Sequence, residues 1–308
     1  MATTVSPAIG NSIGLASEYL PLLDEVYKAA SKTAILDTAQ DRVRWSDEYH
    51  TFYLFETSMG GLGNYSRNGG FVRGDVTAQW RAYEPQWDRG RQFLCDRIDN
   101  SESLGMAFGT LAGEFMRTKV VPETDAVRFA TYAQKAAAAH KDTESLANSA
   151  AVVASIDDAT AALDDAEVPY EGRILFVNPT IYKLFKGGIT RYTMNGENGI
   201  DYNIEMYNDM RVITVPSGRF NTEITLAEPS AHDDAGGYTA TGSTINYMII
   251  HPSAIMQAVK LANPRIFSPE VVQEAQAWMY DFRQYHGAWV KKQKENGIYV
   301  SAASFPST

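Results

Sequence analysis

The stretch that decides the fold is Trp278-Met-Tyr-Asp-Phe-Arg-Gln-Tyr-His-Gly-Ala-Trp-Val-Lys-Lys-Gln-Lys-Glu-Asn-Gly-Ile-Tyr-Val-Ser301, close to the end of the chain. It is dense in aromatic and β-branched residues, which fit pleated strands. Turn signals interrupt it at His286-Gly287 and at Asn296-Gly297, and an Asn-Gly pair supplies the positive φ angles of a tight hairpin turn. The stretch therefore predicts that the chain ends in long strands rather than in a tail.

The composition is that of an ordinary globular protein. The 308 residues are 44% hydrophobic and 21% charged, and the formal net charge of -10 argues against a protein that reads DNA through a basic face. Cys95 is the only cysteine, so no intrachain disulfide can form, and we interpret it as a plain thiol. No signal peptide and no long apolar run are visible, so we expect a soluble product made in a reducing cytoplasm.

The middle of the chain alternates between strand and helix patterns. Two apolar runs each end in a residue followed by proline, and each is expected to be a buried strand that leads into a helix. Strands are expected at 173–177, 211–215 and 245–250, and helices at 142–167, 180–186 and 253–262. This alternation is typical of an α/β unit.

Residues 99–140 are expected to hold two helices. Asp99 and Glu102 can form a capping box for the first helix. Its apolar stripe recurs at spacings of four, three and four, through Leu104, Phe108, Leu111 and Phe115. Pro122 is tolerated in the first turn of the second helix, which is expected to run to about Ala139.

The first 98 residues look extended rather than globular. Residues 1–45 have the character of an arm, and its segment 19–30 places Leu22, Leu23, Val26 and Tyr27 on one face. Such a stripe either binds a partner or straps the protein's own core. Residues 46–98 predict a two-stranded excursion around a glycine-rich stretch, with a return strand at 92–98. We interpret the glycines as a flexible loop, because Ser66 stands where a dinucleotide-binding loop needs its third glycine.

The chain shows no recognised catalytic, cofactor-binding or metal-binding motif. The isolated histidines, including His251 and His286, are interpreted as structural, and Asp157, Asp158, Asp164 and Asp165 as a solvated helix face. A metal site in the loop with His232, Asp233 and Asp234 is the weaker interpretation, because three neighbouring side chains rarely suffice. We therefore predict no enzyme, no catalytic residue, no cofactor and no metal site.

The order of these segments resembles that of the HK97-fold major capsid proteins of tailed bacteriophages. Two sequence segments add to this resemblance. The passage from the family's E-loop into its spine helix is similar to Glu84-Pro-Gln-Trp-Asp-Arg-Gly-Arg-Gln-Phe-Leu-Cys-Asp-Arg-Ile-Asp-Asn-Ser-Glu-Ser103. The passage out of the spine helix is similar to Glu114-Phe-Met-Arg-Thr-Lys-Val-Val-Pro-Glu-Thr-Asp125. The resemblance implies an α+β capsid fold. Its parts would be an N-terminal arm (1–45), an E-loop hairpin (46–98), a P-domain with the spine helix (99–141), an α/β A-domain (142–266), and return strands of the P-domain with the C-terminus (267–308).

The resemblance also implies a function. The chain would assemble with itself, as hexamers and pentamers, into an icosahedral shell that encloses a double-stranded DNA genome without reading its sequence. The implied partners are a separate scaffolding protein, a portal and, in some shells, a decoration protein; no membrane is involved. The implied location is the virion capsid, assembled in the cytoplasm of a bacterial host.

Two departures from the family pattern carry chemical consequences. No lysine lies between Lys32 and Lys119, so this E-loop cannot donate the lysine of an isopeptide cross-link. About 45 residues precede the E-loop, without a long heptad pattern, so we expect a separate scaffolding protein and little or no processing of this chain.

Arginines are concentrated in the predicted E-loop, where they outnumber the acids. We predict assembly contacts, together with two tryptophans, at Arg67, Arg73, Arg81, Arg89, Arg91, Arg97, Trp80 and Trp87. Acidic partners are expected on a neighbouring subunit, at the 157–165 helix face or the 228–234 loop. The alternative is ordinary solvated charge, where an exposed pair contributes about 0–1 kcal/mol.

Three rival hypotheses remain open at the level of sequence. The nearest is an encapsulin, a cellular compartment of the same fold that holds cargo enzymes. A soluble α/β enzyme built on residues 142–266, using His251 or His232, belongs to a different class. A phage decoration or tail protein is the third, and it would form no closed shell alone.

Overall fold

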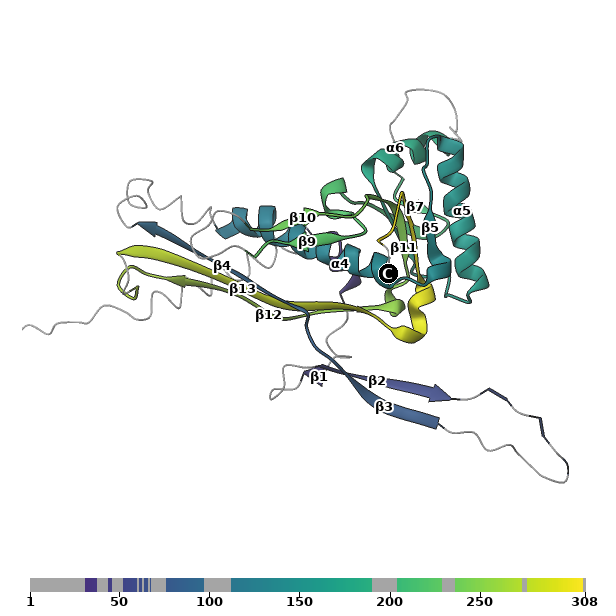
Figure 1. Cartoon of the computed structure of the whole chain (residues 1–308), viewed down its shortest axis with the longest axis horizontal. Helices are drawn as coiled ribbons and strands as arrows, with labels where there is room; N and C mark the ends of the chain where they lie inside the picture. The colour runs from purple at the N-terminus through teal and green to yellow at the C-terminus, as the bar shows by residue number, and fades with distance from the viewer. Residues whose placement is uncertain are drawn as a thin grey trace, which may run out of the picture.

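The fold was analysed in a computed structural model, which describes residues 31–37, 44–45, 52–59, 61–62, 64–65, 67, 76–96, 112–189, 204–228, 236–272 and 276–306. Figure 1 shows a body built on a sheet with helices, a long sheet that extends from the body, and a small sheet that stands apart. Some expectations lie outside the described residues: the segment 19–30, the capped helix start before residue 112, and the loop with His232, Asp233 and Asp234.

A six-stranded sheet forms the centre of the body. Its strands lie in the order β5 (Lys141–Thr143), β14 (Ile298–Ala302), β11 (Ile245–Ile250), β6 (Ile174–Val177), β8 (Met210–Thr214) and β7 (Met206–Tyr207). Helices α5 (Ser149–Asp165) and α6 (Pro179–Gly188) pack on one face, and α4 (Val121–Lys135) packs on the other. The central strands are continuous apolar runs because both of their faces are buried.

The strand–proline–helix pattern is confirmed at one of its two positions. Asn178 caps α6, with its side-chain oxygen accepting a hydrogen bond from the Thr180 backbone N–H at 2.9 Å. At the second position the predicted helix over 253–262 is wrong. The chain makes only a 3-10 turn at Pro252–Ala254 and then enters β12 (Ile255–Phe267), which pairs along its length with β13 (Ala277–Val290). Long-range pairing here overrides a local sequence that tolerates a helix.

The long sheet has the order β12-β13-β4, where β4 is Trp87–Asp96. The predicted turn at His286-Gly287 is wrong, because β13 passes straight through both residues. Gly287 serves packing instead: a Cβ at this position would lie 2.3 Å from the Trp289 ring. The predicted return strand at 92–98 exists but begins earlier, at Trp87.

Helical structure runs without a break from residue 112 to Lys135. A π-helical segment at Met116–Val120 leads directly into α4, and Pro122 lies just after the change from π-helix to α-helix. The predicted helix with Pro122 in its first turn is confirmed as α4, but it ends at Lys135 rather than near Ala139 and continues directly from the helical segment before it. This continuous helix lies against the long sheet, where Met116 and Val120 pack on Tyr280 and Phe282.

The last strand, β14, does not pair with β13. A 3-10 segment at Lys292–Gly297 connects them, and β14 joins the six-stranded sheet beside β11. The predicted tight hairpin turn at Asn296-Gly297 is therefore wrong. All five residues of β14 are buried, which explains why the strand lies inside the body.

The small sheet contains β1 (Arg44–Trp45), β2 (Phe52–Met59) and β3 (Val76–Tyr83). The β2–β3 hairpin confirms the predicted excursion, and it extends away from the body (Figure 1). A second small hairpin, β9 (Ile224–Leu226) with β10 (Tyr238–Ala240), lies beside α4, and a 3-10 turn at Ala34–Leu36 lies beside β12. Across the described residues, no helix is long and apolar enough to span a membrane.

Candidate functional site: the junction of α4 with the long sheet

Arg89 of β4 holds three elements together at this junction. Its guanidinium donates to both carboxylate oxygens of Glu123 on α4, at 2.7 and 3.5 Å. It also donates to the carbonyl oxygens of Ala227 at 2.8 Å and Gly237 at 3.3 Å, next to the β9–β10 hairpin. Arg89 is therefore engaged within its own chain, and its first role is to fix β4 and the hairpin to α4.

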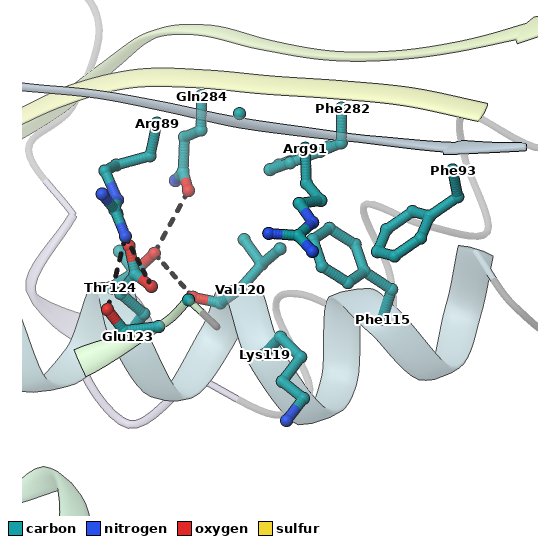
Figure 2. A pocket seen from close by; sticks show the side chains of 13 residues that line it. Arg89, Arg91, Phe93, Phe115, Lys119, Val120, Glu123, Thr124, Phe282 and Gln284 are labelled. Carbon is teal, nitrogen blue, oxygen red and sulfur yellow. Dashed lines mark hydrogen bonds and ion pairs between the residues drawn. The ribbon is translucent and has the colours of Figure 1, made fainter. Parts of the chain in front are cut away.

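A cavity of about 270 Å³ lies beside Arg89, between β4, β13 and the helix. Figure 2 shows Phe93, Phe115 and Val120 between the strands and the helix, with Arg91 beside them, whereas the Lys119 side chain extends from the helix away from the strands. The Phe93 and Phe115 rings meet edge to face, with centroids 4.9 Å apart. The lining thus combines aromatic side chains with three cationic side chains and the carboxylate of Glu123.

The start of the described chain is bound on the other side of α4. Asp125, fully buried, accepts hydrogen bonds from the Ser31 and Thr33 hydroxyls at 2.7 Å each and from the Lys32 backbone N–H at 2.9 Å. Arg219 donates to the same carboxylate at 3.3 Å. A buried carboxylate is stable only with such partners, so Asp125 anchors residues 31–33 to the helix.

The same anchor extends to β12 and explains a buried arginine. Gln257 of β12 donates to the Thr33 carbonyl oxygen and to Asp37, at 2.6 Å each, and accepts from the Tyr132 hydroxyl at 2.7 Å. Arg128, fully buried, donates to the Thr33 hydroxyl at 2.9 Å. Residues 31–37 are therefore held between α4 and β12, at the edge of the long sheet away from β4.

His286 lies buried between the two charged clusters. Its ring packs on Trp87 with centroids 5.4 Å apart, and only 3% of the residue is exposed. Burial, and then the positive charges of Arg128 and Arg89, lower the pKa of His286 to about 3. The imidazole is therefore neutral at physiological pH, which suits a packing role and not proton transfer near pH 7.

The tip of the projecting hairpin is apolar. Met59 and Val76 form a cross-strand pair and are 69% and 67% exposed, and Leu62 and Tyr65 near the tip are also exposed. Its base is attached to the body, where Tyr83 packs edge to face on Trp289 with centroids 6.0 Å apart. This hairpin is the second candidate surface, because exposed apolar residues at the end of a projecting element mark a contact site.

The predicted assembly residues do not form one cluster. Arg89, Arg91 and Trp87 lie at the junction, whereas Arg67 and Arg81 are exposed on the projecting part. The Arg81 guanidinium lies 6.0 Å from the Tyr83 ring. Trp80 lies in β3, but its side chain is outside the described part, as are Arg73 and Arg97 altogether. Their role in assembly stays a prediction.

Three of the other residues singled out in the sequence have partners within the chain: His251, Asp157 and Asp164. His251 bonds through its two ring nitrogens to the Ser253 hydroxyl and the Glu171 carbonyl, at 2.7 and 3.1 Å. Asp157 accepts from the Tyr207 hydroxyl at 2.7 Å, and Asp164 accepts from Arg173 at 2.6 Å. Among the described residues, no group of three His, Cys, Asp or Glu side chains could hold a metal ion.

Sequence reasoning missed the cavity, because its lining comes from four separate segments. A signal was present in the period-two repeat of Arg89, Arg91 and Phe93 along one strand face, and in the spacing of four between Phe115, Lys119 and Glu123 along a helix. Each pattern defines a face, but neither shows that the two faces meet.

A mixed α+β body, a long helix against a long sheet and a projecting hairpin together are typical of the HK97-like capsid fold. Comparison with solved structures agrees. The chain is similar to a structure from Mycobacterium phage Che8, at 15% identity and a TM-score of 0.62, over 90% of this chain and 92% of that one. It is similar to the mature capsid of bacteriophage PhiM1, at 10% identity and a TM-score of 0.57, over 85% of this chain and 84% of that one.

A third similar structure, from Gordonia phage Cozz, matches over 99% of both chains, at 12% identity and a TM-score of 0.56. A scan of protein-family models and a search of curated proteins found no match. At these identities the likeness establishes the fold, and the expected α+β HK97-like architecture is confirmed.

Proposed function

We propose that this chain is a major capsid protein, which assembles with itself into the icosahedral shell of a tailed bacteriophage. The observation that carries the proposal is the β1–β2–β3 sheet, which extends from an HK97-like body with Met59 and Val76 exposed at its tip. A sheet this small is marginal without a covering layer. A neighbouring copy of the chain supplies that layer in a shell.

The fold neighbours support this proposal over an enzyme. PhiM1 and the cyanophage P-SCSP1u contribute capsid structures to the comparison. The enzyme hypothesis relies on His251 or His232. Both ring nitrogens of His251 are engaged, by the Ser253 hydroxyl and the Glu171 carbonyl, and His232 lies outside the described residues.

Finer features of the proposal follow from the same function. The shell consists of hexamers and pentamers, encloses double-stranded DNA without reading its sequence, and forms in the cytoplasm of the bacterial host. A separate scaffolding protein, a portal and a decoration protein are its proposed partners. The division into arm, E-loop, P-domain and A-domain is part of the same proposal; in the structure β12 belongs to the long sheet and β14 to the six-stranded sheet.

Electron microscopy of the purified full-length chain, beside its size-exclusion profile, tests the proposal. Closed shells tens of nanometres across are expected, alone or after addition of a scaffolding protein, and nucleic acid inside shells from infected cells separates a capsid from an encapsulin. A monomer that forms no shell under either condition contradicts the proposal.

A further inference from the structure

We propose that the cavity beside Arg89 is a binding site for a small neutral aromatic molecule of the phenol class, a single ring that carries a hydroxyl group. The inference goes beyond the proposed function, because the site lies within one chain and needs no second subunit. The cavity lies between β4, β13 and the continuous helix (Figure 2). Its size, its aromatic side and an unpaired amide group together define the ligand.

The volume of the cavity suits one aromatic ring with a substituent. An engineered apolar cavity of roughly 150 Å³ in another protein binds benzene. The cavity in this chain has a volume of about 270 Å³, so it holds one ring and leaves room for a hydroxyl group. Pockets for drug-sized ligands span about 300–1,000 Å³, so a much larger molecule is not expected here.

Three phenylalanine rings form the apolar side of the site. Phe115 of the helix meets Phe93 of β4 and Phe282 of β13 edge to face, with ring centroids 4.9 and 6.0 Å apart. Phe93 and Phe115 are only partly buried, so a ligand can cover their remaining ring surface. Water beside these rings lacks the polar partners that an ordered water needs. An aromatic ligand replaces that water with the edge-to-face contacts that aromatic rings prefer.

Gln284 of β13 supplies a polar contact for the ligand. This residue lines the cavity and is 4% exposed. Its Oε1 accepts a hydrogen bond from the Thr124 hydroxyl at 3.2 Å, whereas its Nε2 has no acceptor among the residues that the structure describes. A buried donor without an acceptor lowers stability. The hydroxyl oxygen of a phenol can accept this bond, which an unsubstituted apolar ring cannot do.

The charged side chains around the cavity favour a neutral ligand. Arg89 and Glu123 form an ion pair at 2.7 Å, and Arg91 is also engaged within the chain. The Lys119 side chain extends from the helix away from the strands (Figure 2). A carboxylate ligand would lose its hydration and would have to compete with Glu123 for Arg89, so it should bind less well than a neutral phenol.

A ligand-detected NMR titration of the full-length chain tests the site, with phenol as the probe. We expect saturable binding with a dissociation constant on the order of 1 mM, since so small a ligand reaches only modest affinity. Toluene, which lacks the hydroxyl group, and benzoate, which is charged, should each bind about tenfold more weakly. Hydrogen–deuterium exchange of the same sample should slow at residues 115–124 when phenol is present, because the bound ring contacts this part of the helix.

The variant Gln284→Met removes the amide with little change in side-chain volume. The affinity for phenol should fall about fivefold to tenfold, toward that for toluene, while the affinity for toluene should stay within about twofold of the parent value. The matched control is Gln92→Met. Gln92 is exposed, lies on the other face of β4 and does not line the cavity, so this variant should leave both affinities unchanged.

The variant Val120→Phe fills the cavity and supplies a second measurement. Val120 lines the cavity and is 8% exposed, so a larger side chain takes the space of the ligand. Where circular dichroism shows the parental fold, binding of phenol and of toluene should both fall at least about tenfold. Phenol binding that does not saturate, that is unchanged in Gln284→Met, or that is no tighter than toluene binding overturns the proposal.

Discussion

The six-stranded sheet and the projecting β1–β2–β3 sheet differ in how far their residues are buried within the chain. The strands β6, β11 and β14 are buried on both faces, by α4 on one side and by α5 and α6 on the other. In the projecting sheet the tip residues Met59 and Val76 are two-thirds exposed, and no helix from the described part of the chain lies on either face (Figure 1). The first sheet is covered on both faces by helices of the same chain, and the second is not covered by any helix of the described residues.

This difference in burial predicts which residues stabilise a single chain and which residues contribute to association between chains. Substitutions in the body are expected to change the free energy of unfolding of one chain, and substitutions at the hairpin tip to change association between chains. The junction of α4 with the long sheet lies between these extremes, because Arg89 and Asp125 act within the chain while the cavity is open. The predictions below test this separation, beginning with the largest expected effect.

Phe129→Ala should cause the largest loss of stability. Phe129 is fully buried and meets the rings of Phe176 and Phe220 edge to face, with centroids 5.1 and 5.0 Å apart. Removing the ring leaves a cavity that costs about 3–5 kcal/mol of unfolding free energy. Urea denaturation followed by circular dichroism measures it, and a loss below about 1 kcal/mol would show that the body does not depend on this layer.

Asp125→Asn should detach the arm from the body. The amide keeps the shape but loses the charge-assisted bonds from Ser31, Thr33 and Arg219, so we expect a loss of about 2–3 kcal/mol. Limited proteolysis should cut near residue 31 faster than in the parent chain. Asp165→Asn, at an exposed position on α5, is the control and should change neither measurement.

His286 should make the junction sensitive to acid. Its folded-state pKa of about 3 lies below the ordinary value of 6.5, so the unfolded chain binds a proton first as the pH falls. The stability that this difference contributes is fully present above pH 6.5 and is lost between pH 6.5 and 3. Between pH 7 and pH 5 the loss is about 1–2 kcal/mol.

The variant His286→Gln isolates this contribution from those of the other histidines. The difference between parent and variant unfolding free energies, measured at pH 7 and at pH 5, should shrink by about 1–2 kcal/mol as the pH falls. An unchanged difference would mean that His286 is hydrated in solution, and that the junction is more open than the structure indicates.

Arg89 and Glu123 should be coupled within one chain. A double-mutant cycle of Arg89→Ala and Glu123→Ala is expected to give a coupling free energy of about 1 kcal/mol, because the pair is only partly exposed and doubly bonded. Arg81→Ala is the control and should stay within about 0.5 kcal/mol of the parent. A coupling free energy near zero in the isolated chain, together with loss of assembly in the variants, would instead support a role of Arg89 in contacts between subunits.

The sequence predicted best those elements that are buried on every side or that depend only on residues close in sequence. The strands at 174–177 and 245–250 were identifiable because burial on both faces makes almost every residue apolar, and Asn178-Pro179 marks a helix start by its own chemistry. The HK97-like class followed from the order of segments. Residues 253–262 were wrongly predicted to be helical, because Met256, Gln257 and Leu261 suit a helix and only pairing with β13 makes them a strand.

The site was less accessible to sequence reasoning than the fold. Arginines at 67–97 indicated a charged surface, but not that Arg89 is turned inward to Glu123 while Arg81 stays exposed. Asp125 gave no signal, since its partners Ser31 and Thr33 lie more than 90 residues away. Such contacts depend on the docking of elements, which no local pattern encodes.

Met59→Ser with Val76→Thr should have the smallest effect on the chain and a clear one on assembly. The two side chains pair across the hairpin and are 69% and 67% exposed, so the free energy of unfolding should change by no more than about 0.5 kcal/mol. Sedimentation velocity should nevertheless show fewer shells at a given concentration, because burial of these groups against a neighbour contributes about 25 cal/mol for each Å² of apolar surface. Thr57→Ser with Ala78→Ser, at the next pair but one along the same hairpin, is the matched control. Unchanged assembly would show that the tip is not an intersubunit surface, and the contrast between the two sheets would then reflect folding alone.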